Sequence, residues 1–262
     1  MTDHLSESHK RTEQKLLQYK KCLRDSSFYK LIHDSLAHAP FKHVRCLALG
    51  SPTDEFQALY QLALLHLLIE DYKISPENVS FHDPAFTQDD VEYLSVAHGH
   101  LVEESCDWDS GATLYYMPHS PRSLTETIMN EKNVCWILGN DLTVTMGTLS
   151  AVKFLQECPT LATAVHINEK DQPRKAPEDG FTPVIKKKRK GRANKLVYVE
   201  TELDYKVDSV YFEKVIITPL KCPKDSPWRL SFSDLAFNEL QLKTNTTEEA
   251  ASQELSQEKS ST

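Results

Sequence analysis

The sequence predicts an α/β fold built on an open, mostly parallel sheet, and two patterns between residues 43 and 140 lead to this prediction. Short apolar runs alternate there with longer segments whose apolar residues recur at helical spacing, which is typical of right-handed βαβ crossovers. The short runs are apolar at successive positions, as in strands that helices cover on both faces. We therefore expect a buried parallel sheet at the core.

The elements expected in this core follow one another in a regular order. Thr53 or Asp54 is the expected N-cap of the first core helix, and Thr87 with Asp90 resembles a capping box at the start of the second. The alternation predicts a doubly wound, Rossmann-like sheet with helices on both faces. The expected strands are 44–49, 79–82, 100–102, 113–116 and 134–138, and the expected helices are 53–72, 87–97 and 121–129.

The rest of the chain divides into segments of different character. Residues 1–40 are expected to form N-terminal amphipathic helices, and residues 41–242 a single α/β domain whose C-terminal strands complete one edge of the sheet. The other expected segments are a helix over 148–158, a strand over 161–167, a mobile basic insert over about 168–195, edge strands over 196–199 and 212–217, and a disordered tail over 243–262.

Composition narrows the classes of function and location. The formal net charge of −8 argues against general nucleic-acid binding, which usually shows a basic surface. The six cysteines are scattered without a C-x-x-C pair, so we expect free thiols in a reducing compartment. The longest apolar stretch, residues 58–69, is interrupted by Gln61 and His66 and is shorter than the roughly 20 residues of a bilayer span. With no secretion signal apparent, we expect a cytoplasmic and nuclear protein with no membrane partner.

Ligands of an open α/β sheet bind outside the carboxyl ends of its strands, near the point where the strand order reverses. Polar residues follow each expected strand, and a parallel sheet would place them along one edge. Some of them, including His82, Glu103, Glu104 and Asp141, are weaker candidates. The ligand-binding candidates, around a crevice expected between the first and fourth strands, are Gly50, Ser51, Asp83, Met117, Pro118, His119 and Asn140.

The chemistry of this edge stays open at the level of sequence. A full G-x-G-x-x-G is absent, and Pro52 removes a backbone donor after Gly50, which argues against a phosphate loop. Asp83 stands where an acidic residue binds ribose hydroxyls in nucleotide- and adenosylmethionine-binding sheets; alternatively, it turns the chain before Pro84. His119 is either an acid, a base or a hydrogen-bond donor, or a structural loop histidine.

Catalytic and metal-binding sets can be written from the same residues, but their spacing does not favour them. A Ser51–His119–Asp83 triad lacks the G-x-S-x-G elbow that exposes a nucleophile. A metal site of His82, Asp83 and His119 lacks close ligand spacing. We therefore assign no catalytic residue and no metal ligand, and the cofactor stays unknown.

A dense basic run interrupts the otherwise acidic chain at residues 186–192. It is a candidate nuclear import signal or a binding segment for a local anionic patch on a partner. The alternative is a solvated loop without a binding role. The import candidates are Lys186, Lys187, Lys188, Arg189 and Lys190.

Several short motifs occur together in one order: residues 45–52, 58–64 and 81–87, then Asp90, then residues 115–119. With these motifs the chain closely resembles the sensitivity-to-red-light-reduced (SRR-like) family over residues 43–140. Later positions resemble the fungal branch of that family, which includes a benomyl-resistance protein. Those positions are Trp228, residues 231–236 and Asn238.

The resemblance implies a regulatory role: light input and circadian timing in plants, control of haem biosynthesis in animals, and microtubule-related processes in fungi. It brings no agreed catalytic activity and no catalytic residues. We therefore expect a non-enzymatic regulatory protein that binds a small nucleoside-like ligand or a protein partner at the sheet edge. The alternative is an adenosylmethionine-dependent methyltransferase or another nucleoside-binding enzyme. A third interpretation is an adaptor that docks through its N-terminal helices.

Overall fold

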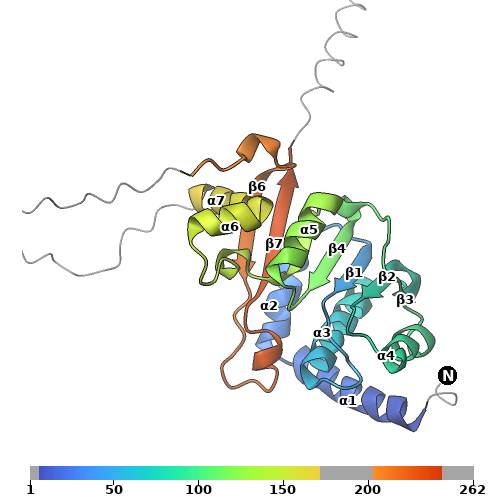
Figure 1. Ribbon diagram of the computed structural model, residues 1–262. Coiled ribbons are helices and arrows are strands. Elements are labelled where there is room, and N and C mark those ends of the chain that lie inside the picture. The colour runs from blue at the N-terminus through green and yellow to red at the C-terminus, as the bar shows by residue number, and fades with distance from the viewer. Residues whose placement is uncertain (1–5, 172–202, 244–262) are drawn as a thin grey trace, which may run out of the picture.

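The computed structural model describes residues 6–171 and 203–243. These residues form an α/β structure around a seven-stranded sheet with the order β3-β2-β1-β4-β5-β7-β6 (Figure 1). Strands β1 to β5 run parallel to one another, whereas β7 is antiparallel to both β5 and β6. The strands are β1 (His43–Leu47), β2 (Val79–His82), β3 (Leu101–Val102), β4 (Thr113–Met117), β5 (Trp136–Asn140), β6 (Phe212–Pro219) and β7 (Leu235–Leu242). The predicted mostly parallel α/β sheet is confirmed.

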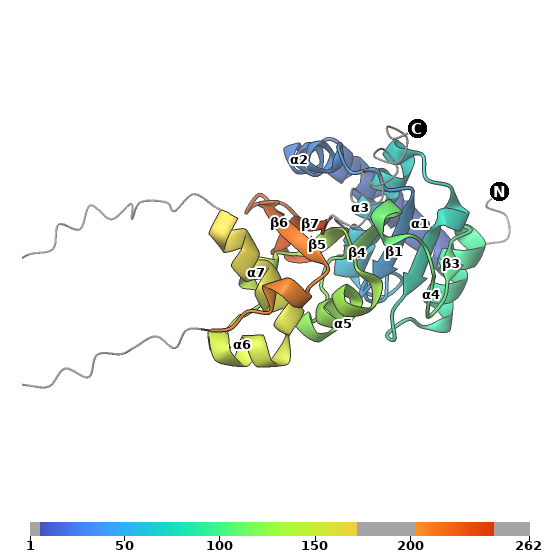
Figure 2. The same ribbon diagram turned by 90° about the horizontal axis from the view of Figure 1, so that it is seen from above.

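Helices lie on both sides of this sheet, with α1 to α3 on one side and α5 to α7 on the other (Figure 2). A π-helical turn, Tyr93–Ala97, continues α4. The helices are α1 (Glu7–Arg24), α2 (Ser27–Leu36), α3 (Phe56–Tyr72), α4 (Gln88–Glu92), α5 (Arg122–Lys132), α6 (Ala151–Glu157) and α7 (Pro159–Asp171). None of the helices in the described part of the chain is long and apolar enough to cross a membrane.

Two hydrophobic cores cover the two faces of the sheet. The first joins α1, α2 and α3 to β1, β2 and β4, and the second joins α5, α6 and α7 to β5, β6 and β7. The longest apolar stretch of the sequence lies in α3, where every residue from Ala58 to Ile69 is buried. Burying a large aliphatic side chain stabilises the fold by about 1.5–3 kcal/mol, so α3 is a main source of the stability of the first core.

Some predicted boundaries and elements were wrong. Helix α3 begins at Phe56, and neither Thr53 nor Asp54 caps it, because the Thr53 side chain binds Asp90 instead. The segment expected as a strand over 161–167 belongs to α7. Its apolar residues Leu161, Ala164 and Ile167 are buried at a spacing of three residues, which fits one helix face. The capping box of Thr87 and Asp90 is present at the start of α4, as predicted.

The C-terminal edge of the sheet also differs from the expectation. The strand predicted over 212–217 is β6, and its partner is β7, which the sequence analysis did not predict. The strand expected over 196–199, the basic run and the expected tail from residue 244 lie outside the described residues. Of the expected insert, residues 168–171 belong to α7 and the remainder also lies outside the described residues.

Candidate functional site

A cavity of about 700 Å³ lies beside the carboxyl ends of β1 and β2, against α5. Its size is that of a site for a small organic molecule, and its walls are mostly apolar. The loop after β3 closes one side. The residues that bear on its chemistry are Arg45, Ala48, His82, Asp83, Glu104, Cys106, Tyr115, Leu124, Thr127, Ile128, Glu131 and Lys132.

Arg45 builds one wall of this cavity from inside strand β1. Its side chain is buried, and its guanidinium donates to the carbonyl oxygens of Glu103 at 3.0 Å and Glu104 at 2.7 Å, and to the hydroxyl of Ser80. Ser80 in turn donates to the Glu103 carboxylate at 3.0 Å. A buried guanidinium must have its donors satisfied, so Arg45 fixes the loop after β3 where it borders the cavity. A charged residue inside an apolar strand was the signal that sequence reasoning missed.

Asp83 connects the loops that follow β1 and β2. Its Oδ2 accepts the Gly50 N–H at 2.8 Å, and its Oδ1 accepts the Ala85 N–H at 2.8 Å. Gly50 has φ +78°, a left-handed conformation that glycine adopts without steric cost. A carboxylate offers about four acceptor positions, so Asp83 can accept further hydrogen bonds from a ligand hydroxyl. Both the chain-turning and the ligand-binding interpretations of Asp83 fit this geometry.

Ala48 adds backbone strain at the wall of the cavity. It has φ +53°, although it carries a Cβ, and it follows the last residue of β1. This conformation costs a non-glycine residue roughly 1–2 kcal/mol. Residues held in such conformations gather at binding and catalytic sites, where the surrounding structure enforces them.

Ser51 belongs to a buried network instead of the cavity wall. Its hydroxyl donates to Asp90 Oδ1 at 2.9 Å, and the same oxygen accepts the N–H and hydroxyl of Thr53 at 3.1 and 2.7 Å. The other oxygen, Oδ2, accepts the N–H and hydroxyl of Thr87, both at 2.9 Å. Burial acts to raise the pKa of Asp90, but these donors outweigh it and hold the pKa below its ordinary value. The network joins the loop after β1 to the start of α4.

The remaining predicted residues lie away from the cavity. Met117 and Pro118 are buried, whereas His119 is exposed on the loop after β4. Partial burial of the ring lowers the pKa of His119, and the hydrogen bond to the Leu230 carbonyl acts in the opposite direction. Asn140 donates to the Ser120 carbonyl at 2.8 Å and lines a second, more open hollow of about 470 Å³. Of the seven candidates, Asp83 alone lines the large cavity, and the weaker candidates His82 and Glu104 join it.

The ionisable groups of the cavity are acidic on balance. Asp83, Glu104 and Glu131 line it with two cations, Arg45 and Lys132. Arg45 is occupied by backbone carbonyls, and Lys132 donates to the Cys106 carbonyl at 3.3 Å and to Asp107 at 3.2 Å. Burial raises the pKa of Tyr115, which therefore remains neutral near pH 7. This arrangement suits an uncharged or cationic organic ligand better than a phosphate.

Comparison with known proteins gives one family. The chain is similar to the SRR1 domain, whose family model matches residues 12–238. It is also similar to an SRR1-like protein of Drosophila melanogaster, with 30% identity over 93 residues, which are 34% of this chain and 33% of that protein. The aligned part thus spans about a third of that relative. No solved structure gives a significant match.

Proposed function

The chain belongs to the SRR1 domain family, and from that premise we propose that it is a non-enzymatic regulatory protein that binds a small nucleoside-like ligand in the cavity beside β1, β2 and α5. The observation that carries the proposal is the position of this cavity at the carboxyl ends of two parallel strands. In open α/β sheets that edge is where ligands bind.

The strand order supports the same position. β1 lies between β2 and β4, and the chain continues outward from β1 through β2 to β3, then returns to β4 on the other side of β1. Such a reversal is the topological switch point of doubly wound sheets, and it leaves a crevice between the loops at the carboxyl edge. We therefore propose that the sheet is of the Rossmann-like, doubly wound type.

The lining favours a nucleoside without phosphates. Leu124 and Ile128 of α5 offer an apolar wall for a planar base. Asp83 has free acceptor capacity for ribose hydroxyls, as acidic residues after the second strand have in nucleoside sites. The carboxylates of Asp83, Glu104 and Glu131 would repel a phosphate and attract a cationic group such as the sulfonium and ammonium of adenosylmethionine.

A thermal-shift comparison of adenosine, adenosylmethionine, ATP and haem tests this proposal. We expect adenosine or adenosylmethionine to raise the melting temperature and ATP to do so less, because its phosphates meet the carboxylates. In Thr127→Trp, the indole would fill the cavity from α5 and abolish the shift. Ser123→Trp is the matched control, since Ser123 lies on the same helix but lines the other hollow.

The outcomes of this experiment separate the alternatives. An equal shift in Thr127→Trp would place the ligand elsewhere, and no shift with any of the four compounds would overturn the nucleoside proposal. Methyl transfer from bound adenosylmethionine to a protein or small-molecule acceptor would replace the regulatory proposal with that of a methyltransferase.

We further propose that the chain belongs to the fungal branch of the family and acts in microtubule-related processes. The support is the sequence resemblance at Trp228 and Asn238, both of which are buried in the fold. Cells whose only copy carries Thr127→Trp should become more sensitive to a microtubule-depolymerising drug than cells with Ser123→Trp. Equal growth of the two strains under the drug, with equal protein levels, would contradict this role.

A further inference from the structure

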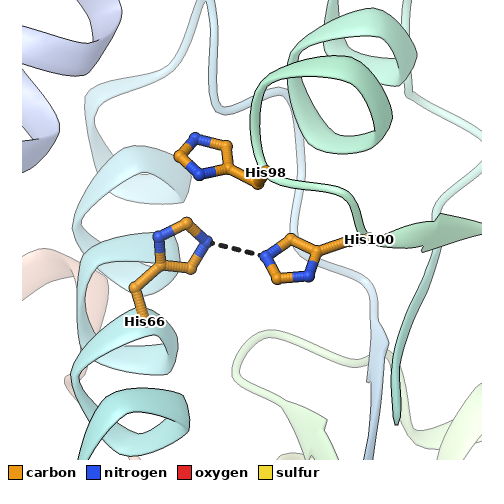
Figure 3. A group of neighbouring side chains, drawn as sticks. All are labelled: His66, His98 and His100. Carbon is orange, nitrogen blue, oxygen red and sulfur yellow. Dashed lines mark hydrogen bonds between the residues drawn. The ribbon is translucent and has the colours of Figure 1, made fainter. Parts of the chain in front are cut away.

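Three histidines, one from α3 and two from the short connection before β3, meet in the first hydrophobic core. His66 projects from the middle of α3, His98 follows the π-helical turn after α4, and His100 directly precedes β3 (Figure 3). His66 and His100 are buried, and His98 is nearly so, with 16% of its side chain exposed. Within the described residues, this is the one group of potential ligands close enough together to hold a metal ion.

The geometry of the three rings fits one ion. Ligand nitrogens of all three residues lie within 4.8 Å of one another, and the Nε2 atoms of His66 and His100 are 3.2 Å apart. Zinc–imidazole bonds of about 2.0–2.1 Å in a tetrahedron place neighbouring nitrogens roughly 3.3 Å apart. The nitrogens of His66 and His100 are therefore already about as far apart as two ligands of one zinc ion. The His98 nitrogen, within 4.8 Å of the others, would have to come closer when an ion binds.

Aromatic side chains pack against the three rings. The Phe81 ring lies 5.2 Å from that of His100 and the Tyr93 ring lies 4.8 Å from that of His98, measured between centroids. This packing holds the histidine rings close together in the core.

Glu13 of α1 supplies the outer carboxylate that metal-binding histidines commonly have. Its Oε2 lies 3.3 Å from His98 Nε2 and accepts the Tyr93 hydroxyl at 2.8 Å. In Figure 3, one nitrogen of His98 faces His66 while the other points away from the cluster. A carboxylate on the outer nitrogen fixes the ring orientation and places the proton there, which leaves the inner nitrogen free for the ion.

We propose that His66, His98 and His100 bind a divalent transition-metal ion of the zinc class, with a water molecule at the fourth position and Glu13 orienting His98. Imidazole ligands favour zinc, copper, nickel and cobalt over calcium and magnesium. The Glu13 carboxylate offsets part of the ionic charge. The ion would join α1, α3 and the segment that enters β3, and the proposal does not depend on a ligand in the cavity.

Metal binding is tested on the full chain after stripping with a chelator and dialysis against zinc or cobalt. We expect one equivalent of zinc by elemental analysis, and a visible absorption spectrum of tetrahedral type with cobalt. His66→Gln and His100→Gln should lose this binding, and Glu13→Gln should weaken it by about 10- to 100-fold, as removal of an outer-shell partner commonly does. His33→Gln is the control, because His33 lies on the surface of α2 with 41% of its side chain exposed.

Three results would overturn the proposal: no retained ion in the wild-type chain, retention of the ion in both His66→Gln and His100→Gln, or an octahedral cobalt spectrum. Circular dichroism shows whether each variant folds. If the core variants do not fold, the wild-type stoichiometry and cobalt spectrum, together with the Glu13→Gln affinity, still decide the question. The Glu13 side chain lies at the edge of the cluster and is half-buried, so its replacement leaves the core apolar packing in place.

Discussion

Replacing Asp90 with Asn is expected to destabilise the fold strongly, although the two side chains have nearly the same shape. Asp90 is fully buried, and its carboxylate accepts five hydrogen bonds from Ser51, Thr53 and Thr87. Two of these donors are backbone N–H groups, of Thr53 on one oxygen and of Thr87 on the other. The carboxylate can accept from both at once, but an amide has a single oxygen.

The magnitude follows from the groups that the amide leaves unpaired. Whichever way the Asn side chain is oriented, its NH₂ faces either the Thr53 N–H or the Thr87 N–H. The Ser and Thr hydroxyls can rotate toward another acceptor, but a backbone N–H cannot, so one N–H loses its partner. One buried unpaired N–H costs about 1–3 kcal/mol, and the lost charge weakens the remaining bonds by about 1 kcal/mol in total. We expect a loss of about 3 kcal/mol, which corresponds to roughly 6–12 °C in melting temperature for a domain of this size.

The same residue gives a prediction for pH. The pKa of Asp90 in the folded protein lies below its ordinary value of 3.8, so the unfolded chain takes up its proton first as the pH falls. The stabilisation by Asp90 is therefore complete above about pH 5, and it is lost as the pH falls through 3.8 and then through the folded pKa. The difference in stability between wild type and Asp90→Asn should shrink over that acidic range.

Urea denaturation followed by circular dichroism measures this effect at pH 7 and at pH 3, which lies below the unfolded pKa. Asp54→Asn is the matched control, because Asp54 is exposed in the same loop, and its replacement should change stability by less than about 0.5 kcal/mol. A loss below about 1 kcal/mol for Asp90→Asn at pH 7 would refute the account of the network as a requirement of the fold.

Three further results are expected. Glu126→Gln should lower the free energy of unfolding by about 2 kcal/mol, as measured by urea denaturation. The buried Glu126 carboxylate accepts the Thr160 and Leu161 N–H groups at 2.9 and 2.8 Å at the start of α7. An unchanged urea midpoint would contradict this capping role. Gly139→Ala should lower the free energy of unfolding in the same assay by about 1–3 kcal/mol, because the new Cβ would lie only 2.7 Å from the Met117 carbonyl oxygen. Gly111→Ala is the control and should be tolerated, because the nearest atom to its new Cβ would be 3.5 Å away. Replacing Lys186 to Lys190 with Ser should lower nuclear accumulation of a fluorescent fusion, and unchanged localisation would exclude an import role for the basic run.

The sequence alone determined the alternation of strands and helices in the core. Apolar runs and helical spacing are local, so β1 to β5 and α3 to α5 were predictable to within a few residues at their boundaries. The capping box of Thr87 and Asp90 was also predictable, because both partners stand within one helical turn. By contrast, residues 161–167 are short and apolar, a pattern that strands and buried helices share, and the prediction of a strand there was wrong.

Only the tertiary structure decided which polar residues meet. Gly50 and Asp83, predicted at one edge, are joined there by a hydrogen bond, because parallel strands end on the same side. The edge nevertheless separates into a buried network at Asp90, a cavity bounded by Arg45 and α5, and an open hollow at Asn140. The cluster of His66, His98 and His100 has no local signal, since His66 stands on a mostly apolar helix 32 residues before His98. Periodicity fixes the face on which a residue lies, but its neighbours across the core depend on how distant elements pack.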